Sequence, residues 1–205
     1  MFDASIQGLI NGPLNWAGDH LCRWGVRANS VTLVGTAMAV ATAVSLSTGR
    51  YTLALAFLSL NRLLDGLDGA VARASERTDL GGYLDIVSDY VFYAGVPLGF
   101  AFAEPQKNAL PAAALLASFL LTCCTFLAFA ALADQRDLAM EPRREKSFFY
   151  SRGLMEGTET IGFFVAMTLW PERFAALAWA FSILCVITAL QRTWVAVKLF
   201  QSSGE

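Results

Sequence analysis

Four aspartates stand in two pairs, each at helical spacing, within or near apolar stretches of the chain. They are Asp65, Asp68, Asp85 and Asp89. Ionisable side chains inside a membrane-length apolar span are costly and usually functional. Hard divalent cations prefer carboxylate oxygens as ligands, and two such ions about 3.5 to 4 Å apart can stabilise the attacking and leaving oxygens of phosphoryl chemistry. The acids therefore predict a centre that holds two Mg²⁺ or Mn²⁺ ions.

Helical geometry brings these acids together with small residues. At about 100° per residue, one stripe less than half a circumference wide forms on the first acidic helix. It contains Asp65, Asp68, Gly69, Ala72 and Arg73. On the next helix, residues spaced i, i+4, i+8 lie within about 80° of one another. They are Gly81, Asp85 and Asp89. Four carboxylates on adjacent helices would repel one another unless cations bind between them.

A purely structural alternative remains for both sets of residues. The aspartates could form buried ion pairs with the arginines Arg62, Arg73 and Arg77. We regard this as less favoured, because burying an ion pair is often no better than neutral for stability. Gly69, Ala72 and Gly81 could likewise serve only close helix packing, but their place on the acidic stripes suits the approach of a nucleotide.

Composition indicates a membrane protein rather than a soluble one. Of the 205 residues, 56% are hydrophobic and 16% are charged, against about 25% charged in soluble domains. The net charge of -2 lacks the basic excess typical of nucleic-acid binding, so no nucleic-acid partner is expected. The bilayer itself is the expected environment.

The apolar segments predict an all-α integral membrane protein with about six transmembrane helices. A bilayer core of about 30 Å needs roughly 20 apolar residues per helix, and six segments come near this length. They span approximately residues 31–49, 52–73, 82–103, 109–133, 154–170 and 174–199. We expect one domain over 1–205, with an interfacial helix in 1–28 and a six-helix bundle in 31–199.

The distribution of lysine and arginine predicts the orientation. Positive residues are retained on the cytoplasmic side of a membrane. With a cytoplasmic N-terminus, ten basic residues face inside: Arg23, Arg27, Arg73, Arg77, Arg136, Arg143, Arg144, Lys146, Arg152 and Lys198. Three face outside, namely Arg50, Lys107 and Arg173. Both termini and the acidic site are therefore expected on the cytoplasmic side, with a bacterial inner membrane as the expected location.

The acidic pattern resembles a known signature. The order is Asp65-x2-Asp68-Gly69-x2-Ala72-Arg73, seven residues, then Gly81-x3-Asp85-x3-Asp89. Eight fixed residues over 25 positions look like the complete motif of the CDP-alcohol phosphatidyltransferases. The pair Asn29-x2-Thr32 resembles that family's N-terminal element, and the six-helix layout is similar as well.

The resemblance implies a role for each motif residue. Asp65, Asp68 and Asp85 would bind metal, and Asp89 would bind metal and act as general base. The CDP site would be lined by Asp68, Gly69, Ala72, Arg73 and Gly81. The implied reaction is attack of an alcohol on the lipid-side phosphorus of CDP-diacylglycerol or a related CDP-lipid, with CMP leaving. A homodimer is also implied.

The acceptor is less well defined by the sequence. Arg152 and Glu156 are spaced i, i+4 and Glu159 follows, so these side chains could face the site or could belong to an ordinary cytoplasmic loop. Basic residues outnumber acids in this region, which favours a phosphorylated polyol such as glycerol phosphate or inositol phosphate. An amino alcohol remains the alternative, and the role of Arg192 is open.

Two other classes of membrane protein could use intramembrane aspartates. A magnesium-dependent prenyltransferase would not require the Gly69-x2-Ala72-Arg73 element. A cation transporter would be expected to have ligands near the midplane and broken helices in two matching halves. No matching second half is visible in this sequence, so we prefer the interpretation as a phosphatidyltransferase.

Overall fold

The computed structural model describes residues 3–76, 78–135 and 157–202. Within these ranges the chain is helical and contains no strand. The α-helices are α1 (Asp3–Arg23), α2 (Ala28–Ser47), α3 (Tyr51–Ala74), α4 (Asp79–Ala103), α5 (Pro105–Gln135), α7 (Gly157–Leu169) and α8 (Phe174–Ser202). A short 3-10 helix, η1 (Pro171–Arg173), connects α7 to α8. The predicted all-α fold is confirmed for the described residues.

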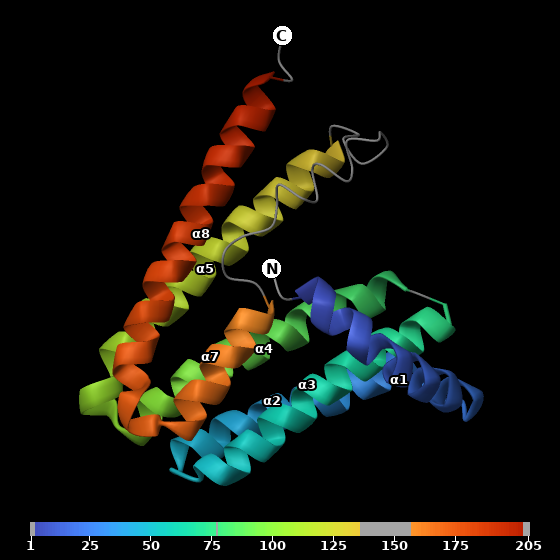
Figure 1. The fold of residues 1–205 in the computed structure, drawn as a ribbon, viewed down its shortest axis with the longest axis horizontal. Coiled ribbons are helices and arrows are strands. Elements are labelled where there is room, and N and C mark those ends of the chain that lie inside the picture. The colour runs from blue at the N-terminus through green and yellow to red at the C-terminus, as the bar shows by residue number, and fades with distance from the viewer. Residues whose placement is uncertain (1–2, 77, 136–156, 203–205) are drawn as a thin grey trace.

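The helices form two connected groups (Figure 1). In the first group, α2 packs along both α3 and α4, α1 lies across α3, and α7 contacts α3. In the second, α5 runs beside α8, and α5 also contacts α4. Because α2 lies against both acidic helices, it forms the third wall of any site built between α3 and α4.

The helix ends follow from local sequence. Gly25 and Gly49 end the turns after α1 and α2 with φ of 77° and 72°, conformations that L side chains rarely adopt. The Thr78 hydroxyl accepts a hydrogen bond from the Gly81 amide at 3.0 Å and so caps α4, as threonine commonly does at helix N-termini. The acidic stretch of α4 therefore begins at a defined residue.

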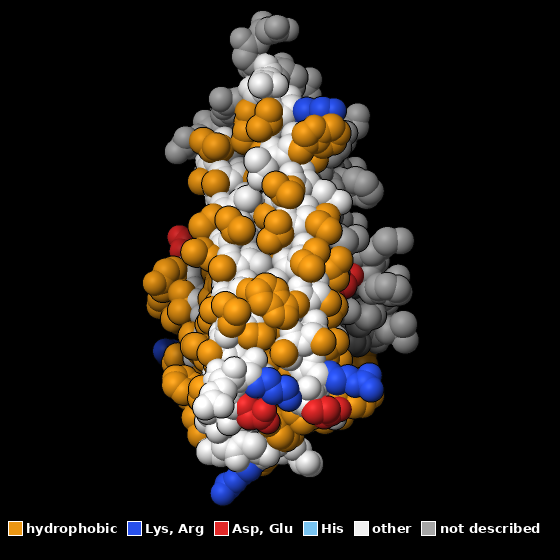
Figure 2. Space-filling model, turned by 90° about the vertical axis from the view of Figure 1, so that its left-hand side faces the viewer, with side chains coloured by type: hydrophobic (Ala, Val, Ile, Leu, Met, Phe, Trp, Pro, Cys, Tyr) orange, Lys and Arg blue, Asp and Glu red, His pale blue; other side chains and the backbone are white. Residues whose placement is uncertain are grey.

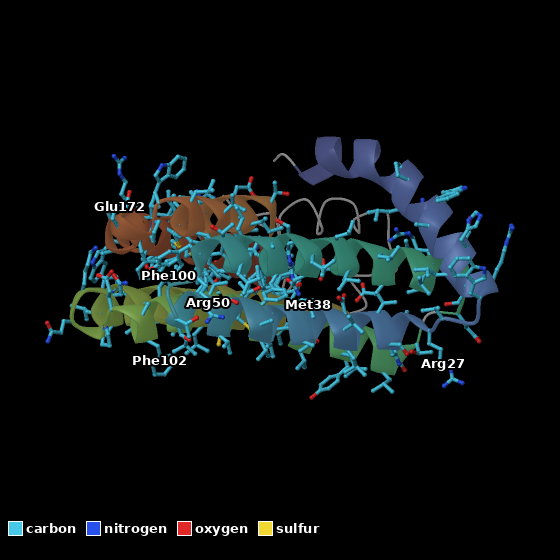
Figure 3. The ribbon with its side chains drawn as sticks, turned by 90° about the horizontal axis from the view of Figure 1, so that it is seen from below. Arg27, Met38, Arg50, Phe100, Phe102 and Glu172 are labelled. Carbon is cyan, nitrogen blue, oxygen red and sulfur yellow. The ribbon has the colours of Figure 1, made fainter. Side chains whose placement is uncertain are left out.

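Aromatic side chains fill the core where the two groups meet. Phe100 stacks on Phe174 with ring centroids 4.3 Å apart, and Phe163 stacks on Phe181 at 4.5 Å. Phe100 is fully buried, whereas Phe102 is 71% exposed. Figure 3 shows Phe100 directed between the helices and Phe102 directed away from them. This contrast is expected where the outer face contacts lipid.

Four helical stretches of the described residues are long and apolar enough to cross a membrane. They are Ala28–Ser47, Asp79–Ala103, Pro105–Leu132 and Pro171–Gln201. One face of the molecule is apolar over most of its length, with charged side chains gathered near one end (Figure 2). The other two predicted segments form α3, which carries the charged motif, and α7, which has 13 residues. The number of six spans stays a prediction.

Close packing of α2 on α4 depends on Gly99. A Cβ at this position would lie 2.7 Å from the Ala43 carbonyl oxygen and 2.8 Å from the Leu46 Cβ. Neither neighbour can rotate away, because one is backbone and the other is the first atom of its side chain. Helix interfaces in membranes are enriched in small residues for this reason.

We therefore expect Gly99→Ala to destabilise the protein. Overpacking of this kind costs about 1 to 3 kcal/mol, and thermal unfolding in detergent should show a lower midpoint. Gly82→Ala is the matched control on the same helix, because a Cβ there meets nothing within 4 Å and alanine favours helix by about 1 kcal/mol over glycine. Equal midpoints for the two variants would contradict this account of the α2–α4 contact.

Candidate active site

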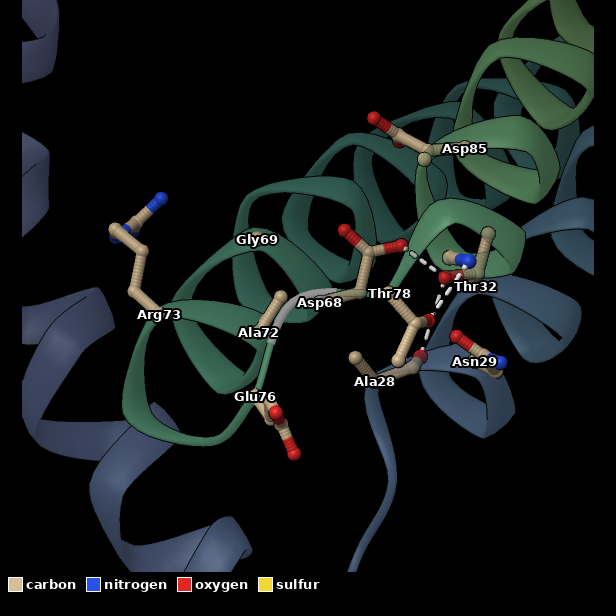
Figure 4. Close-up of a pocket in the computed structure, with 12 residues that line it drawn as sticks. Ala28, Asn29, Thr32, Asp68, Gly69, Ala72, Arg73, Glu76, Thr78 and Asp85 are labelled. Carbon is tan, nitrogen blue, oxygen red and sulfur yellow. Dashed lines mark hydrogen bonds between the residues drawn. The ribbon is translucent and has the colours of Figure 1, made fainter.

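A pocket of about 330 Å³ opens between α2, α3 and α4 (Figure 4). It is lined by Ala28, Asn29, Thr32, Asp68, Gly69, Ala72, Arg73, Glu76, Thr78, Gly81, Gly82 and Asp85. Six of the eight fixed residues of the sequence motif are among them. Helical periodicity placed these side chains on common faces, and the structure turns those faces toward one hollow.

Asp68 is fixed at the inner side of this pocket. The residue is 6% exposed, and its Oδ2 accepts a hydrogen bond of 2.7 Å from the Thr32 hydroxyl of α2 (Figure 4). A buried carboxylate needs such a donor to offset lost hydration. This hydrogen bond connects α3 to α2 through Asp68 Oδ2, and Asp68 Oδ1 takes no part in it.

Gly81 allows α4 to approach the start of α2. A Cβ at this position would lie 3.1 Å from the Asn29 Oδ1 atom and 3.1 Å from the Thr78 Oγ1 atom. Asn29 and Thr78 both line the pocket. A larger residue at position 81 would push these polar groups and narrow the space that the motif encloses.

The N-terminal helix braces the motif helix from the other side. Gly18 of α1 lies so close to Ala70 that an added Cβ would be 2.8 Å from the Ala70 Cβ. Arg73 donates hydrogen bonds from Nε and Nη2 to the Asn15 Oδ1 atom of α1, at 3.3 and 3.0 Å. Figure 4 shows Arg73 at the opposite side of the pocket from Thr32. The position of Arg73 is therefore set partly by α1.

Asp65 and Asp89 are connected through Arg62. The Arg62 Nη1 atom donates to Asp89 Oδ1 at 3.1 Å and lies 3.7 Å from Asp65 Oδ2. Neither of these two aspartates is among the residues that line the pocket. The structural alternative of ion pairs is thus realised for Arg62, but in part-buried form, with the Asp65 and Asp89 side chains 36% and 31% exposed. Arg73 bonds to Asn15 instead, and Arg77 lies outside the described residues.

The acids fit a divalent cation in their chemistry. Asp65 lies within electrostatic range of Asp68, Asp85 and Asp89, and carboxylate oxygens are the ligands that Mg²⁺ and Mn²⁺ prefer. As they stand, no three Asp, Glu, His or Cys side chains among the described residues are grouped closely enough to hold an ion. Side-chain rotation of the aspartates would be needed to complete a ligand set.

The predicted acceptor residues Arg152 and Glu156 lie outside the described residues. Glu159 is in the first turn of α7. Arg192 of α8 donates to the Thr122 carbonyl oxygen of α5 at 3.4 Å, and its guanidinium lies 5.6 Å from the Phe126 ring centroid. It lines a second pocket, of about 450 Å³, between α5 and α8.

Three polar residues near the site were missed by sequence reasoning. Glu76 and Thr78 line the pocket, and Asn15 binds Arg73. Thr78 carries a recognisable signal, because threonine at the start of a helix is a preferred N-cap residue. Asn15 carries none, since periodicity does not tell which helix an interfacial segment will contact.

In this all-α membrane protein, acidic helices line one pocket, an arrangement that suits a membrane enzyme acting on phosphorylated lipids. More specifically, the chain belongs to the CDP-alcohol phosphatidyltransferase family, which it matches over residues 26–190. The family resemblance of the motif is thereby confirmed, and the chain is a membrane-embedded transferase of phospholipid biosynthesis.

Two curated proteins are similar over nearly the whole chain. The inner membrane protein YnjF of Escherichia coli is 49% identical over 194 residues, which cover 95% of this chain and 94% of that protein. The archaetidylinositol phosphate synthase of Pyrococcus horikoshii is 24% identical, covering 95% of this chain and 96% of that protein.

A solved structure shares the fold. The phosphatidylinositol phosphate synthase of Mycobacterium tuberculosis, in complex with manganese and citrate, superimposes with a TM-score of 0.62 at 22% identity. The alignment covers 89% of this chain and 88% of that one. The same synthase with CDP-DAG bound gives a TM-score of 0.61 at 21% identity, covering 89% and 92%.

Proposed function

We propose that this enzyme transfers a phosphatidyl group from CDP-diacylglycerol, or a similar CDP-lipid, to a small hydroxylated acceptor and releases CMP, with Mg²⁺ or Mn²⁺ as cofactor. The single observation that carries the proposal is the pocket that brings six motif residues together between α2, α3 and α4. A CDP-lipid has a charged head and apolar tails, so a polar pocket on an apolar helix bundle suits both of its ends.

The proposed chemistry assigns a role to each acid. Asp65, Asp68, Asp85 and Asp89 would hold two divalent ions, whose charge would neutralise the pyrophosphate and improve CMP as a leaving group. The acceptor oxygen forms a bond to the lipid-side phosphorus, the bond from that phosphorus to CMP breaks, and Asp89 takes the acceptor proton.

The remaining motif residues form the proposed CDP site. Gly69, Ala72 and Gly81 leave room for close approach of the nucleotide, and Arg73 faces its phosphates from the α1 side. The solved synthase of similar fold supports this donor and cofactor, because it was captured with CDP-DAG and with manganese.

A phosphorylated polyol is the acceptor that we favour. Two similar proteins are synthases of inositol phosphate lipids, and the region around Arg152 is rich in basic residues, which suit a phosphate group. An amino alcohol is the second candidate. A phosphatidylcholine synthase of Pseudomonas aeruginosa is 36% identical over 84 residues, or 38% of this chain.

We further propose one domain over 1–205, a homodimer, and a cytoplasmic site and termini in a bacterial inner membrane. The pocket lies beside Arg73 and the start of α2, where Arg27 precedes the helix. This end carries basic residues, as the positive-inside rule requires of a cytoplasmic face. Figure 3 shows Arg27 and Glu172 at opposite ends of the molecule.

The proposal is tested by CMP release from CDP-diacylglycerol in detergent with Mg²⁺. Glycerol 3-phosphate, inositol phosphate, inositol, choline, ethanolamine and serine are each supplied as acceptor. We expect release that depends on one of the two phosphorylated polyols, with the matching lipid product identified by mass spectrometry.

The outcomes distinguish an error in the proposed acceptor from an error in the proposed reaction. Release with choline, ethanolamine or serine alone would keep the reaction but replace the acceptor. The absence of CMP release with every acceptor, from protein that elutes as a single folded species, would overturn the proposed reaction.

A further inference from the structure

Arg62 occupies the space between two of the four motif aspartates. Its Nη1 atom is 3.1 Å from Asp89 Oδ1 and 3.7 Å from Asp65 Oδ2. Mg²⁺ binds carboxylate oxygens at about 2.0 to 2.1 Å, closer than Nη1 lies to either oxygen. An ion drawn between Asp65 Oδ2 and Asp89 Oδ1 would therefore compete with the guanidinium for these two oxygens.

The guanidinium is held in place by contacts with α3 and α4 and, through Asn61, is connected to α2. The Arg62 Nε atom donates to Asn61 Oδ1 at 2.8 Å, and Asn61 Nδ2 donates in turn to the Gly35 carbonyl oxygen of α2 at 2.8 Å. The Arg62 Cζ atom lies 4.2 Å from the centroid of the Phe92 ring of α4. Asn61 and Phe92 are buried, at 1% and 0% exposure. Moving Arg62 therefore breaks a built arrangement.

One part of this arrangement is incomplete. The Arg62 Nη2 atom is buried and has no hydrogen-bond partner within the described part of the chain. A buried donor without a partner is costly, and it commonly marks a group that has another position or another ligand. The contacts with Asn61 and Phe92 hold Arg62 in place between the aspartates. Its Nη2 donor is nevertheless unpaired in this position.

Asp68 and Asp85 are in a different situation. Both line the open pocket, and the ion pairs of Arg62 given above involve only Asp65 and Asp89. An ion that enters from the pocket can reach these two carboxylates without displacing Arg62. We therefore expect Asp68 and Asp85 to bind a divalent ion more readily than Asp65 and Asp89 do.

We propose that Arg62 is a resident cation of the acidic site that competes with one divalent ion for Asp65 and Asp89. The inference rests on the proposed metal dependence and refines it. The wild-type chain binds one divalent ion tightly from the pocket side, and it binds a second ion only at the expense of the Arg62 contacts.

The test measures Mn²⁺ binding directly, by the electron paramagnetic resonance signal of free Mn²⁺ over purified protein in detergent. Arg62→Gln removes the charge but keeps an amide that can still bond to Asn61. In the wild type, a second Mn²⁺ must break the hydrogen bond from Arg62 to Asp89, and in the variant this bond is absent. We therefore expect the second Mn²⁺ to bind about tenfold more tightly in the variant. The affinity for the first Mn²⁺ should change much less.

Arg50→Met is the matched control, because it removes an arginine at the N-cap of the same helix, about three turns away from Arg62, where Arg50 is exposed. It should bind Mn²⁺ as the wild type does. The wild type is itself a test that needs no variant, since two Mn²⁺ ions bound with equal affinity would overturn the inference.

Arg62→Met provides a second variant that removes both charge and donors, and it should show the same tightening. Unchanged affinity in folded Arg62→Gln or Arg62→Met would overturn the inference but leave the metal site intact. An absence of Mn²⁺ binding in wild type and variants alike would overturn both the metal site and the role of Arg62. A failure of the proposed transfer reaction would instead appear in CMP release and not in Mn²⁺ binding.

Discussion

Replacement of Asp89 by asparagine is expected to lower the rate of CMP release by about 10³-fold, within the range of 10²- to 10⁴-fold that a general base contributes. Asparagine has nearly the same shape as aspartate, but its amide cannot accept the acceptor proton and is a weaker ligand for a divalent ion. The measurement is the initial rate of CMP release under saturating CDP-diacylglycerol and acceptor.

Asp79→Asn is the matched control for this variant. Asp79 is an exposed acid in the first turn of the same helix, and it is not among the residues that line the pocket. Its replacement should change the rate by less than about twofold, because a helix N-terminal charge contributes only about 0.3 to 1 kcal/mol to stability. Equal rates for Asp89→Asn and the wild type would remove Asp89 as the base.

Asp89→Asn also removes a partner of Arg62, and this effect must be separated from the loss of catalysis. The Arg62 guanidinium would keep Asp65 at 3.7 Å and its bond to Asn61 at 2.8 Å. Leaving a buried charge with fewer partners is destabilising. Size-exclusion elution and the thermal midpoint should therefore be measured beside the rate, since unfolding and a lost base give different results.

The fold could be predicted from the sequence where the apolar pattern is long. The segment expected over 82–103 is α4, Asp79–Ala103, and it starts earlier because Thr78 supplies the cap. The segment expected from 109 begins at Pro105, since proline is tolerated in the first turn of a helix. Charged residues in α3 make its passage through the bilayer the hardest to predict.

The candidate site could be predicted in its residue types but not in its contacts. Periodicity places Asp68 and Arg73 on one face of α3, yet Asp68 bonds to Thr32 of α2 and Arg73 bonds to Asn15 of α1. The sequence allowed Arg62 to pair with the acids, but it could not choose between such pairs and a ready ligand set. That choice depends on tertiary distances between α3 and α4.

Removal of divalent ions is expected to have the largest effect of all. With EDTA, CMP release should fall by at least about 10³-fold, because without metal the four carboxylates repel the pyrophosphate of the donor and Arg73 is the single motif residue left to face it with a positive charge. Arg62 offsets only part of this charge, as one guanidinium pairs with two carboxylates. Excess Mg²⁺ or Mn²⁺ should restore the rate.

The controls for this experiment distinguish metal binding from general salt effects. EDTA that is already saturated with Mg²⁺ should leave the rate unchanged, and NaCl at equal ionic strength should not restore activity. Bound metal should also raise the thermal midpoint of the wild type, because a ligand that binds only the folded state stabilises it. Activity that persists in EDTA would contradict the metal-dependent mechanism, since the acids around Asp68 and Asp85 would then have to bind the donor without a cation between them.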